Sequence, residues 1–154
     1  MNYVYKIDSF EVYDGDTVKA VVDLGFYTKW EGSIRVYGVD APELRTSVAL
    51  EKHAGTLVRD CVARWLADMS ETIESLFFQS FEKPKFAGRA IGSVFFGEPN
   101  FDEPNFDDTI QDLTNFLNCN GLAKPYTGGT REPWTDDQLH AVIAAAEKYL
   151  KNVV

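Results

Sequence analysis

The sequence predicts a single α+β domain, mainly β, with five strands and three helices over residues 1–154. Two observations favour one domain: a length of 154 residues and a hydrophobic content of 45%. A chain of this size fits one core, and the hydrophobic content is enough to build it. The third observation is the order of the segments, in which strand-like and helix-like patterns follow one another between turn signals.

Three segments near the N-terminus are rich in β-branched and aromatic residues, and Asp14-Gly15 and Gly25 supply turn signals between them. We expect strands over residues 3–13, 17–26 and 32–39, in an antiparallel meander. A long amphipathic helix is expected over residues 47–69, where apolar residues recur at helical spacing. Two further strands, residues 72–81 and 89–96, are expected on either side of a turn region at Lys83-Pro84.

A perfect tandem repeat of five residues, Glu-Pro-Asn-Phe-Asp, occupies residues 98–107. Two units are too few for a solenoid, so we interpret them as a surface loop. Its carboxylates raise the alternative of a second cation site, but its prolines and the lack of a glycine-centred ligand pattern do not match a preorganised calcium loop. Helices are then expected over residues 108–119 and from Thr135 onward, where Thr135 to Gln138 has the form of a capping box.

The formal net charge of −9 argues against a nucleic-acid partner, because such proteins usually carry a basic surface. A local positive charge at the scissile phosphate would suffice for an enzyme that must release its products. No apolar run reaches the roughly 18 residues that span a bilayer, and no secretory signal opens the sequence, so a cytoplasmic protein is expected. Cys61 and Cys119 form no redox or zinc motif, and both are expected to be buried thiols.

Polar residues that a fold would not need concentrate in three places: Asp14-Gly15-Asp16-Thr17, Arg35 with the run from Asp40 to Glu43, and Gly88-Arg89. Asp-Gly alone is a common hairpin turn. The segment from Arg35 to Glu43 is stronger evidence for a functional site. Asp40 and Glu43 follow the strand that carries Arg35, and binding residues are often displayed beyond strand ends.

Phosphodiester hydrolysis requires a positioned water and positive charge on the phosphoryl oxygens. A hard divalent cation prefers oxygen ligands, which Asp16, Asp40 and a main-chain carbonyl could provide together with water. Arginine suits phosphate because its planar fork donates two parallel hydrogen bonds and stays charged. The residue types at these positions therefore point to phosphoryl chemistry.

With Gly121-Leu122-Ala123-Lys124 added, these motifs resemble the staphylococcal nuclease (thermonuclease-like) family in order and spacing, from about Tyr3 to Tyr126. The resemblance implies a five-stranded OB-fold barrel with three α-helices. It also implies an endonuclease that cleaves DNA and RNA with calcium, or alternatively magnesium or manganese, and leaves 3′-phosphate ends. A monomer that binds no membrane is expected.

Residue by residue, the resemblance implies that Asp16, Asp40 and the main-chain carbonyl of Ala41 hold the metal ion. It implies that Glu43 activates or orients the attacking water. The same comparison gives Arg35 and Arg89 the role of binding the phosphate and stabilising its charge in the transition state.

The sequence departs from the family pattern in several places. Ala41 lacks the usual hydroxyl, residues 85–88 replace a more polar run, and the tyrosine-rich nucleotide-binding segment is reduced to Tyr126. Lys124, Tyr126 and Arg131 are candidates for nucleotide contact, with packing or surface roles as the alternative. The Gly-Gly-basic stretch that ends in Trp134 is closer to plasmid- and phage-type relatives, which suggests a phage or mobile-element protein.

Two alternatives remain open. An inactive OB barrel that binds nucleic acid or a protein partner would explain the negative charge but not the intact set of carboxylates and arginines. The acidic surface could also dock a protein partner that brings the enzyme to DNA.

Overall fold

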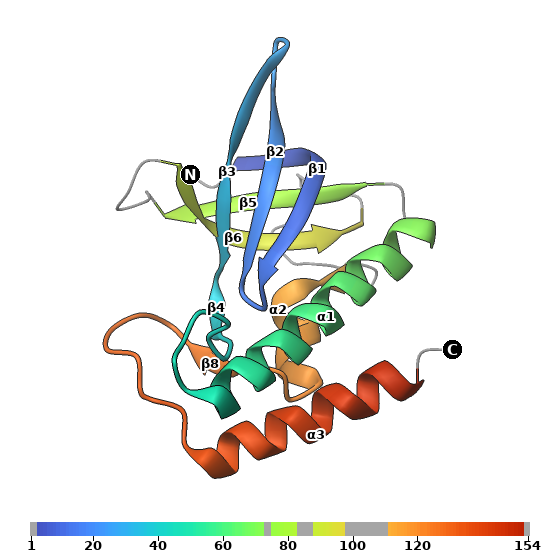
Figure 1. Ribbon diagram of the computed structural model, residues 1–154. Coiled ribbons are helices and arrows are strands. Elements are labelled where there is room, and N and C mark those ends of the chain that lie inside the picture. The colour runs from blue at the N-terminus through green and yellow to red at the C-terminus, as the bar shows by residue number, and fades with distance from the viewer. Residues whose placement is uncertain (1–2, 73–74, 83–87, 98–110, 153–154) are drawn as a thin grey trace.

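Figure 1 shows the computed structural model of the chain, in which helices flank a β-barrel. The structure describes residues 3–72, 75–82, 88–97 and 111–152. The barrel is closed by five strands: β1 (Tyr3–Asp14), β2 (Thr17–Gly25), β3 (Thr28–Val36), β5 (Leu76–Glu82) and β6 (Arg89–Phe96). The helices are α1 (Ala49–Thr72), α2 (Leu113–Cys119) and α3 (Asp136–Asn152). The predicted fold class, an α+β OB-type barrel with five strands and three helices, is confirmed.

The barrel follows the strand order β3-β2-β1-β5-β6, and β6 returns to β3 to close it. The first three strands form the expected antiparallel meander. By contrast, β3 and β6 run parallel, with Ser33 opposite Arg89 and Arg35 opposite Ile91. This closure brings the two arginine-bearing strands side by side, although more than fifty residues separate them in the sequence.

Three short strands were not predicted as separate elements. The strands β4 (Gly38–Asp40) and β8 (Lys124–Tyr126) pair antiparallel, with Asp40 opposite Lys124, and β7 (Gln111–Asp112) adds to β6. Strands of two or three residues are too short to show a period in the sequence. Their pairing matters, because β4 and β8 join the two segments that carry most of the candidate site.

Several predicted boundaries were wrong. The third strand spans Thr28–Val36 rather than residues 32–39, because it starts directly after a two-residue turn and ends before Gly38, whose φ is +89°. Helix α1 continues to Thr72, so β5 begins only at Leu76. Residues 111–112 are paired in β7, so α2 begins at Leu113 rather than at residue 108. The acidic repeat and the Lys83-Pro84 turn lie outside the described residues.

The capping box at Thr135 is confirmed: its hydroxyl accepts a hydrogen bond from the Gln138 main chain at 3.2 Å, and the Gln138 side chain accepts one from the Thr135 main chain at 3.0 Å. Within the described part of the chain, no helix is long and apolar enough to cross a membrane.

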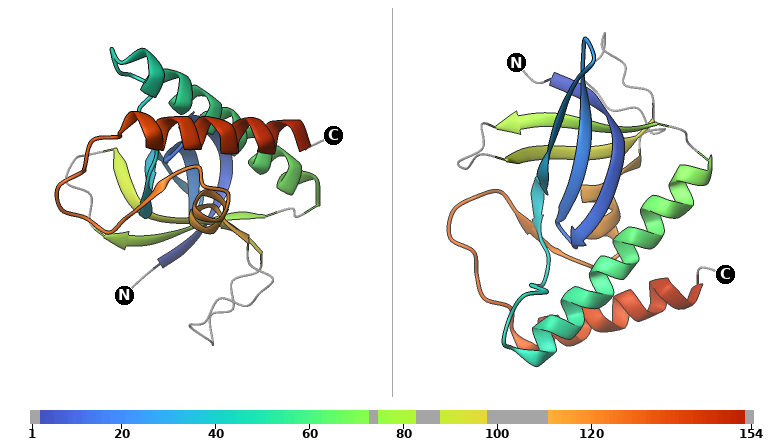
Figure 2. Two further views of the ribbon diagram at one scale, coloured as in Figure 1. Left: turned by 90° about the horizontal axis from the view of Figure 1, so that it is seen from below. Right: turned by 45° about the horizontal axis from the view of Figure 1, so that its top comes forward.

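The core lies between the barrel interior and the buried face of α1, and α3 packs along α1 (Figure 2). Trp65 of α1 stacks on Phe116 of α2 with a ring-centroid separation of 4.9 Å, and Phe116 meets Tyr149 of α3 edge to face. Cys61 is buried in this core as expected, but Cys119 is exposed. The expectation of two buried thiols was therefore wrong for Cys119, which is the last residue of α2.

The β2–β3 hairpin extends away from the barrel, at the opposite end of the molecule from β4 and β8 (Figure 1). Phe26 and Tyr27 form its two-residue turn and are fully exposed to solvent. Both have positive φ, 52° and 62°, a conformation that bulky side chains rarely adopt. The hairpin tip is therefore both apolar and strained.

Candidate active site

The predicted site residues approach one another where the β1–β2 turn, β4 and the N-terminal part of α1 meet. Gly15, in the turn, is buried, and a Cβ on it would lie 2.6 Å from Cγ1 of Val58 and 2.9 Å from Cβ of Ala41. No larger side chain fits there without a shift of its neighbours. Glycine therefore lets the turn pack tightly on α1 and places the next residue, Asp16, beside Ala41.

The Asp16 carboxylate is held by groups from three segments. Its Oδ2 lies 2.9 Å from Nη1 of Arg35 in β3 and accepts a hydrogen bond of 2.9 Å from the main-chain N–H of Ala41. The Thr17 hydroxyl donates to Oδ1 at 3.3 Å. Only 6% of Asp16 is exposed, so these contacts replace water almost completely.

Burial raises the pKa of the Asp16 carboxyl to about 7. The Arg35 charge lowers this pKa, while the nearby Asp14 carboxylate raises it further. Because burial outweighs the attraction to Arg35, the negative charge of Asp16 is incompletely compensated by the protein. Such a carboxylate favours an additional positive charge next to it.

Asp40 ends β4 and is also buried, with 3% of its surface exposed. Nη2 of Arg35 lies 3.9 Å from its Oδ1 and donates a 3.0 Å hydrogen bond to the Val39 carbonyl. Arg35 also donates to the main-chain oxygen of Asp16 at 3.3 Å. One guanidinium thus stands between two buried carboxylates, one from the β1–β2 turn and one from β4.

Glu43 lies beyond β4 on a loop that α1 supports. Its main-chain N–H donates to the Glu51 side chain at 3.1 Å. A Cβ on Gly55 would lie 2.8 Å from the carbonyl oxygens of both Pro42 and Glu43. The loop therefore rests directly on the helix backbone at Gly55, which fixes Glu43 relative to Asp40.

Arg131 joins this group from a distant part of the chain. Its guanidinium bonds to the Asp40 carboxylate through Nη2, and its Nη1 lies 3.2 Å from Oε1 of Glu43. Arg131 belongs to the 127–135 segment, which connects β8 to α3. The structure therefore places this candidate for nucleotide contact against two of the predicted catalytic and metal-binding carboxylates.

Arg89 lies at the start of β6 and is exposed. The β3–β6 register puts it opposite Ser33. Because alternate residues of a strand share a face, Arg89 lies on the same face of the sheet as Arg35, which is two residues after Ser33. Ile91, opposite Arg35, lines an open pocket together with Arg35, Tyr37 and residues 126–129. We call this hollow of about 280 Å³ the Arg35 pocket.

The two other candidates for nucleotide contact differ from each other. Nζ of Lys124 bonds to the Glu132 carbonyl at 3.0 Å and lies 4.2 Å from the centre of the Trp134 ring, so it supports the 127–135 segment. Tyr126 lines the Arg35 pocket and donates its hydroxyl proton to the Gly129 carbonyl at 2.7 Å.

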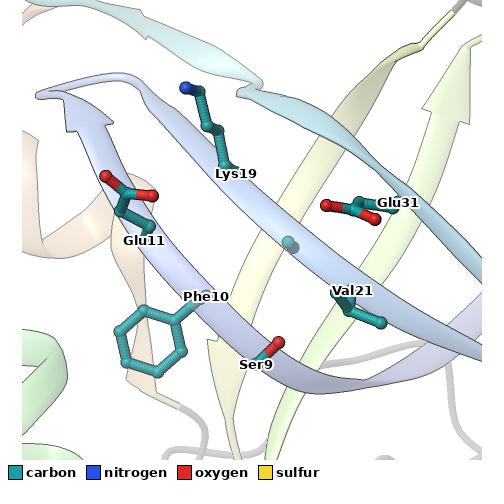
Figure 3. Close-up of a pocket in the computed structure, with 7 residues that line it drawn as sticks. Ser9, Phe10, Glu11, Lys19, Val21 and Glu31 are labelled. Carbon is teal, nitrogen blue, oxygen red and sulfur yellow. The ribbon is translucent and has the colours of Figure 1, made fainter.

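A second open hollow, the Glu43 pocket, measures about 390 Å³. Asp40, Glu43 and Glu51 line it, with Arg131 and Trp134. A third hollow, on the outer face of β1, β2 and β3, gathers Glu11, Lys19 and Glu31 (Figure 3). Neither buried carboxylate lies there, so the first two pockets are the candidate substrate-binding surface.

The donors suit a hard cation better than a soft one. Asp16 and Asp40 offer carboxylate oxygens, which calcium and magnesium prefer, whereas zinc favours thiolate and imidazole ligands. Over the residues that the structure describes, no three His, Cys, Asp or Glu side chains are arranged to hold a metal ion together. A cation at this place would need main-chain, water or substrate oxygens to complete its ligands.

Sequence analysis gave no role to two residues that support the site. Asp14 accepts a hydrogen bond of 3.3 Å from the Asp16 main chain, and Glu51 holds the main chain of Glu43. Asp14 was visible within the Asp-Gly-Asp motif, whereas nothing in the sequence distinguishes Glu51 from other helix-surface glutamates.

Comparison with known proteins adds no assignment: no family model matches the chain, and no curated protein matches it.

Proposed function

We propose that this chain is a divalent-metal-dependent phosphodiesterase that cleaves DNA or RNA strands, like the staphylococcal nucleases that its motifs resemble. The observation that carries the proposal is the convergence of two buried carboxylates, Asp16 and Asp40, on one arginine, Arg35. We favour calcium as the ion and 3′-phosphate ends as the product, both from the family resemblance.

Folding alone does not explain this cluster. Burying charged groups costs several kcal/mol per ion unless they are well paired, and apolar residues of similar size would often be at least as stable. Clusters in which burial shifts a pKa strongly are common at functional sites. The raised pKa of Asp16 and the pockets beside Arg35 and Glu43 therefore favour a binding or catalytic role.

In the proposed mechanism, Asp16 and Asp40 would hold the cation together with the Ala41 carbonyl and water. The bound cation would supply positive charge to the phosphoryl oxygens. Arg35, fixed by main-chain and carboxylate contacts, and Arg89, on the same face of the barrel, bind the phosphate and stabilise its developing charge.

Glu43 orients the attacking water and accepts its proton. The loop that holds Glu43 rests on α1 near Gly55, so the carboxylate keeps its place relative to Asp40. The net charge of −9 limits the affinity for nucleic acid, and we expect weak binding that falls steeply with salt.

The test is cleavage of labelled single-stranded DNA and of RNA by the purified protein, with calcium, with magnesium and with excess chelator. Glu43→Ala and Arg35→Ala should lose activity by orders of magnitude, while Glu147→Ala and Arg59→Ala, on the surfaces of α3 and α1, serve as matched controls. Equal cleavage by wild type and all variants would refute the proposal.

A second candidate function is an inactive OB barrel that binds nucleic acid or a protein partner, which the acidic net charge favours. Fluorescence anisotropy of the same labelled strands distinguishes the two. Binding without cleavage under any of these metal conditions would support the binding module.

A further inference from the structure

Arg131 compensates the two carboxylates that Arg35 compensates least. Arg35 lies 2.9 Å from the Asp16 carboxylate but 3.9 Å from that of Asp40. Arg131 is bonded directly to Asp40 and reaches Glu43 at 3.2 Å. The charge of Asp40 is therefore balanced mainly by Arg131.

The two partners differ greatly in exposure. The Asp40 side chain is 4% exposed, whereas 43% of the Arg131 side chain faces solvent. Asp40 needs a positive partner in place, because an unpaired buried charge is costly. Arg131 can leave at much lower cost, because water can solvate its guanidinium.

A divalent cation at Asp16 and Asp40 would satisfy the same negative charge that Arg131 now satisfies. Two positive groups that share one carboxylate repel each other, so each lowers the affinity of the other for Asp40. Contact with Arg131 also engages Oε1 of Glu43, so a water molecule must compete with the guanidinium for that oxygen.

The position of Arg131 gives it an alternative partner. The 127–135 segment borders both the Arg35 pocket and the Glu43 pocket. The segment is anchored by the Lys124 contacts to Glu132 and Trp134. A phosphate bound at Arg35 would present anionic oxygens next to this segment, and guanidinium groups bind phosphate in a two-pronged geometry.

We propose that Arg131 exchanges partners during binding. In the substrate-free chain Arg131 occupies Asp40 and Glu43, and it moves to a phosphate of the strand when substrate binds; this inference rests on the proposed phosphodiesterase function. The exchange frees Asp40 for the cation and Glu43 for water. Metal and substrate therefore bind cooperatively, and the substrate-free protein binds metal weakly.

The first test measures calcium binding without substrate. The calcium concentration that half-saturates the folded protein is measured by calorimetric titration at one fixed temperature and compared between wild type, Arg131→Ala, Arg131→Gln and Arg131→Lys, with Arg59→Ala as the matched control. We expect the Ala and Gln variants to need about tenfold less calcium, the Lys variant to lie between, and the control to match wild type. Half-saturation of the folded protein does not depend on how stable the calcium-free protein is, as long as it stays folded at that temperature, and the Gln and Lys variants serve if the Ala variant does not fold.

Calcium binding that is equal to or weaker than wild type in the Arg131 variants, or calcium binding by none of the proteins, would overturn the inference. The second test is steady-state cleavage, in which Arg131→Ala should raise KM by about tenfold with a smaller change in kcat. An unchanged KM would overturn the transfer of Arg131 to substrate. If wild type does not cleave but the calcium result holds, the competition at Asp40 stands and the phosphodiesterase proposal alone fails.

Discussion

The residues next to the two ends of β2 reverse the usual rule that charged side chains are exposed and aromatic side chains are buried. At one end, Asp16 is a charged group that is almost wholly buried, and at the other, Phe26 and Tyr27 are aromatic groups that are fully exposed. The buried charge is surrounded by compensating contacts from Arg35, Ala41 and Thr17. The tip has positive φ at both residues.

The two places lower the stability of the fold for different reasons, the burial of a charge at Asp16 and backbone strain at the hairpin tip. Around Asp16, several segments from distant parts of the chain supply partners, so the cost of burial is tied to a chemical arrangement. At the hairpin tip the cost is local backbone strain. Substitutions at the two ends should therefore affect different properties: activity and pH dependence at Asp16 and its partners, and stability alone at the tip.

The largest expected effect is the loss of Arg35 from the charged end. Arg35→Ala should lower kcat/KM for strand cleavage by about 10²–10³, because a single donor to the transition state contributes roughly 3–4 kcal/mol. Arg35→Lys should recover little, since one ammonium cannot bridge Asp16, Asp40 and the Val39 carbonyl as the guanidinium does. Full activity of the Lys variant would show that the charge of Arg35 suffices without its geometry.

The next effect concerns the stability of the metal-free protein and its pH dependence. The pKa of Asp16 in the folded protein, about 7, lies above the ordinary value of 3.8. Folding therefore favours the protonated carboxyl, so the contribution of Asp16 to stability is fully present below about pH 4 and is lost as pH rises to about 7. In excess chelator, Asp16→Asn should stabilise the protein by about 3–4 kcal/mol at pH 8, relative to the same comparison at pH 4.

Urea unfolding of wild type and Asp16→Asn at both pH values measures this difference. Asp137→Asn, on the exposed first turn of α3, is the control for a change of carboxylate to amide. The free energy of unfolding that Asp16→Asn gains over wild type is compared at the two pH values. If this gain is no larger at pH 8 than at pH 4, the buried charge is better compensated than the contacts indicate.

A smaller effect is expected where α1 supports the Glu43 loop. Gly55→Ala introduces a Cβ at 2.8 Å from the Pro42 and Glu43 carbonyl oxygens, so the loop must shift. We expect cleavage to fall by about tenfold, because catalytic groups tolerate little displacement. Thr56→Ala, on the next position of the helix, should leave cleavage unchanged, and an unaffected Gly55→Ala enzyme would show that Glu43 need not be held by α1.

The smallest effect is expected at the hairpin tip. Replacing Phe26-Tyr27 with Asn-Gly, the pair that two-residue hairpin turns with positive φ prefer, should stabilise the protein by about 1 kcal/mol. Urea unfolding measures this gain, and the cleavage rate should not change because the tip lies at the opposite end of the molecule. A loss of stability would mean that the aromatic pair is not strained in its turn.

The sequence predicted much of the barrel because its strands are long enough to show alternation and are bounded by turn residues. Asp16, Arg35, Asp40 and Glu43 could be picked out because short motifs hold them within predicted strands or next to their ends. Their proximity in space required the β-meander and the β4–β8 pairing, and the second of these has no local signal.

Arg131 shows most clearly what the sequence could not provide. It lies 91 residues from Asp40, and its contact depends on how the 127–135 segment crosses from β8 to α3. Glu51 is similar, since only the fold brings its side chain to the main chain of Glu43. The strain at Phe26 and Tyr27 was also hidden, because the residue pair gives no indication of a turn with positive φ.

The most direct test of the proposed function is a single-turnover experiment with a short labelled DNA strand, excess enzyme and calcium, in wild type and Glu43→Gln. Glutamine keeps the size of the side chain but cannot accept a proton from water. We expect wild type to cleave with calcium, to stop on chelation and to resume when calcium is restored, while Glu43→Gln binds the strand and cleaves it at least about a hundredfold more slowly. Equal cleavage by the two proteins, or cleavage that continues in excess chelator, would contradict a metal-dependent phosphodiesterase that uses Glu43.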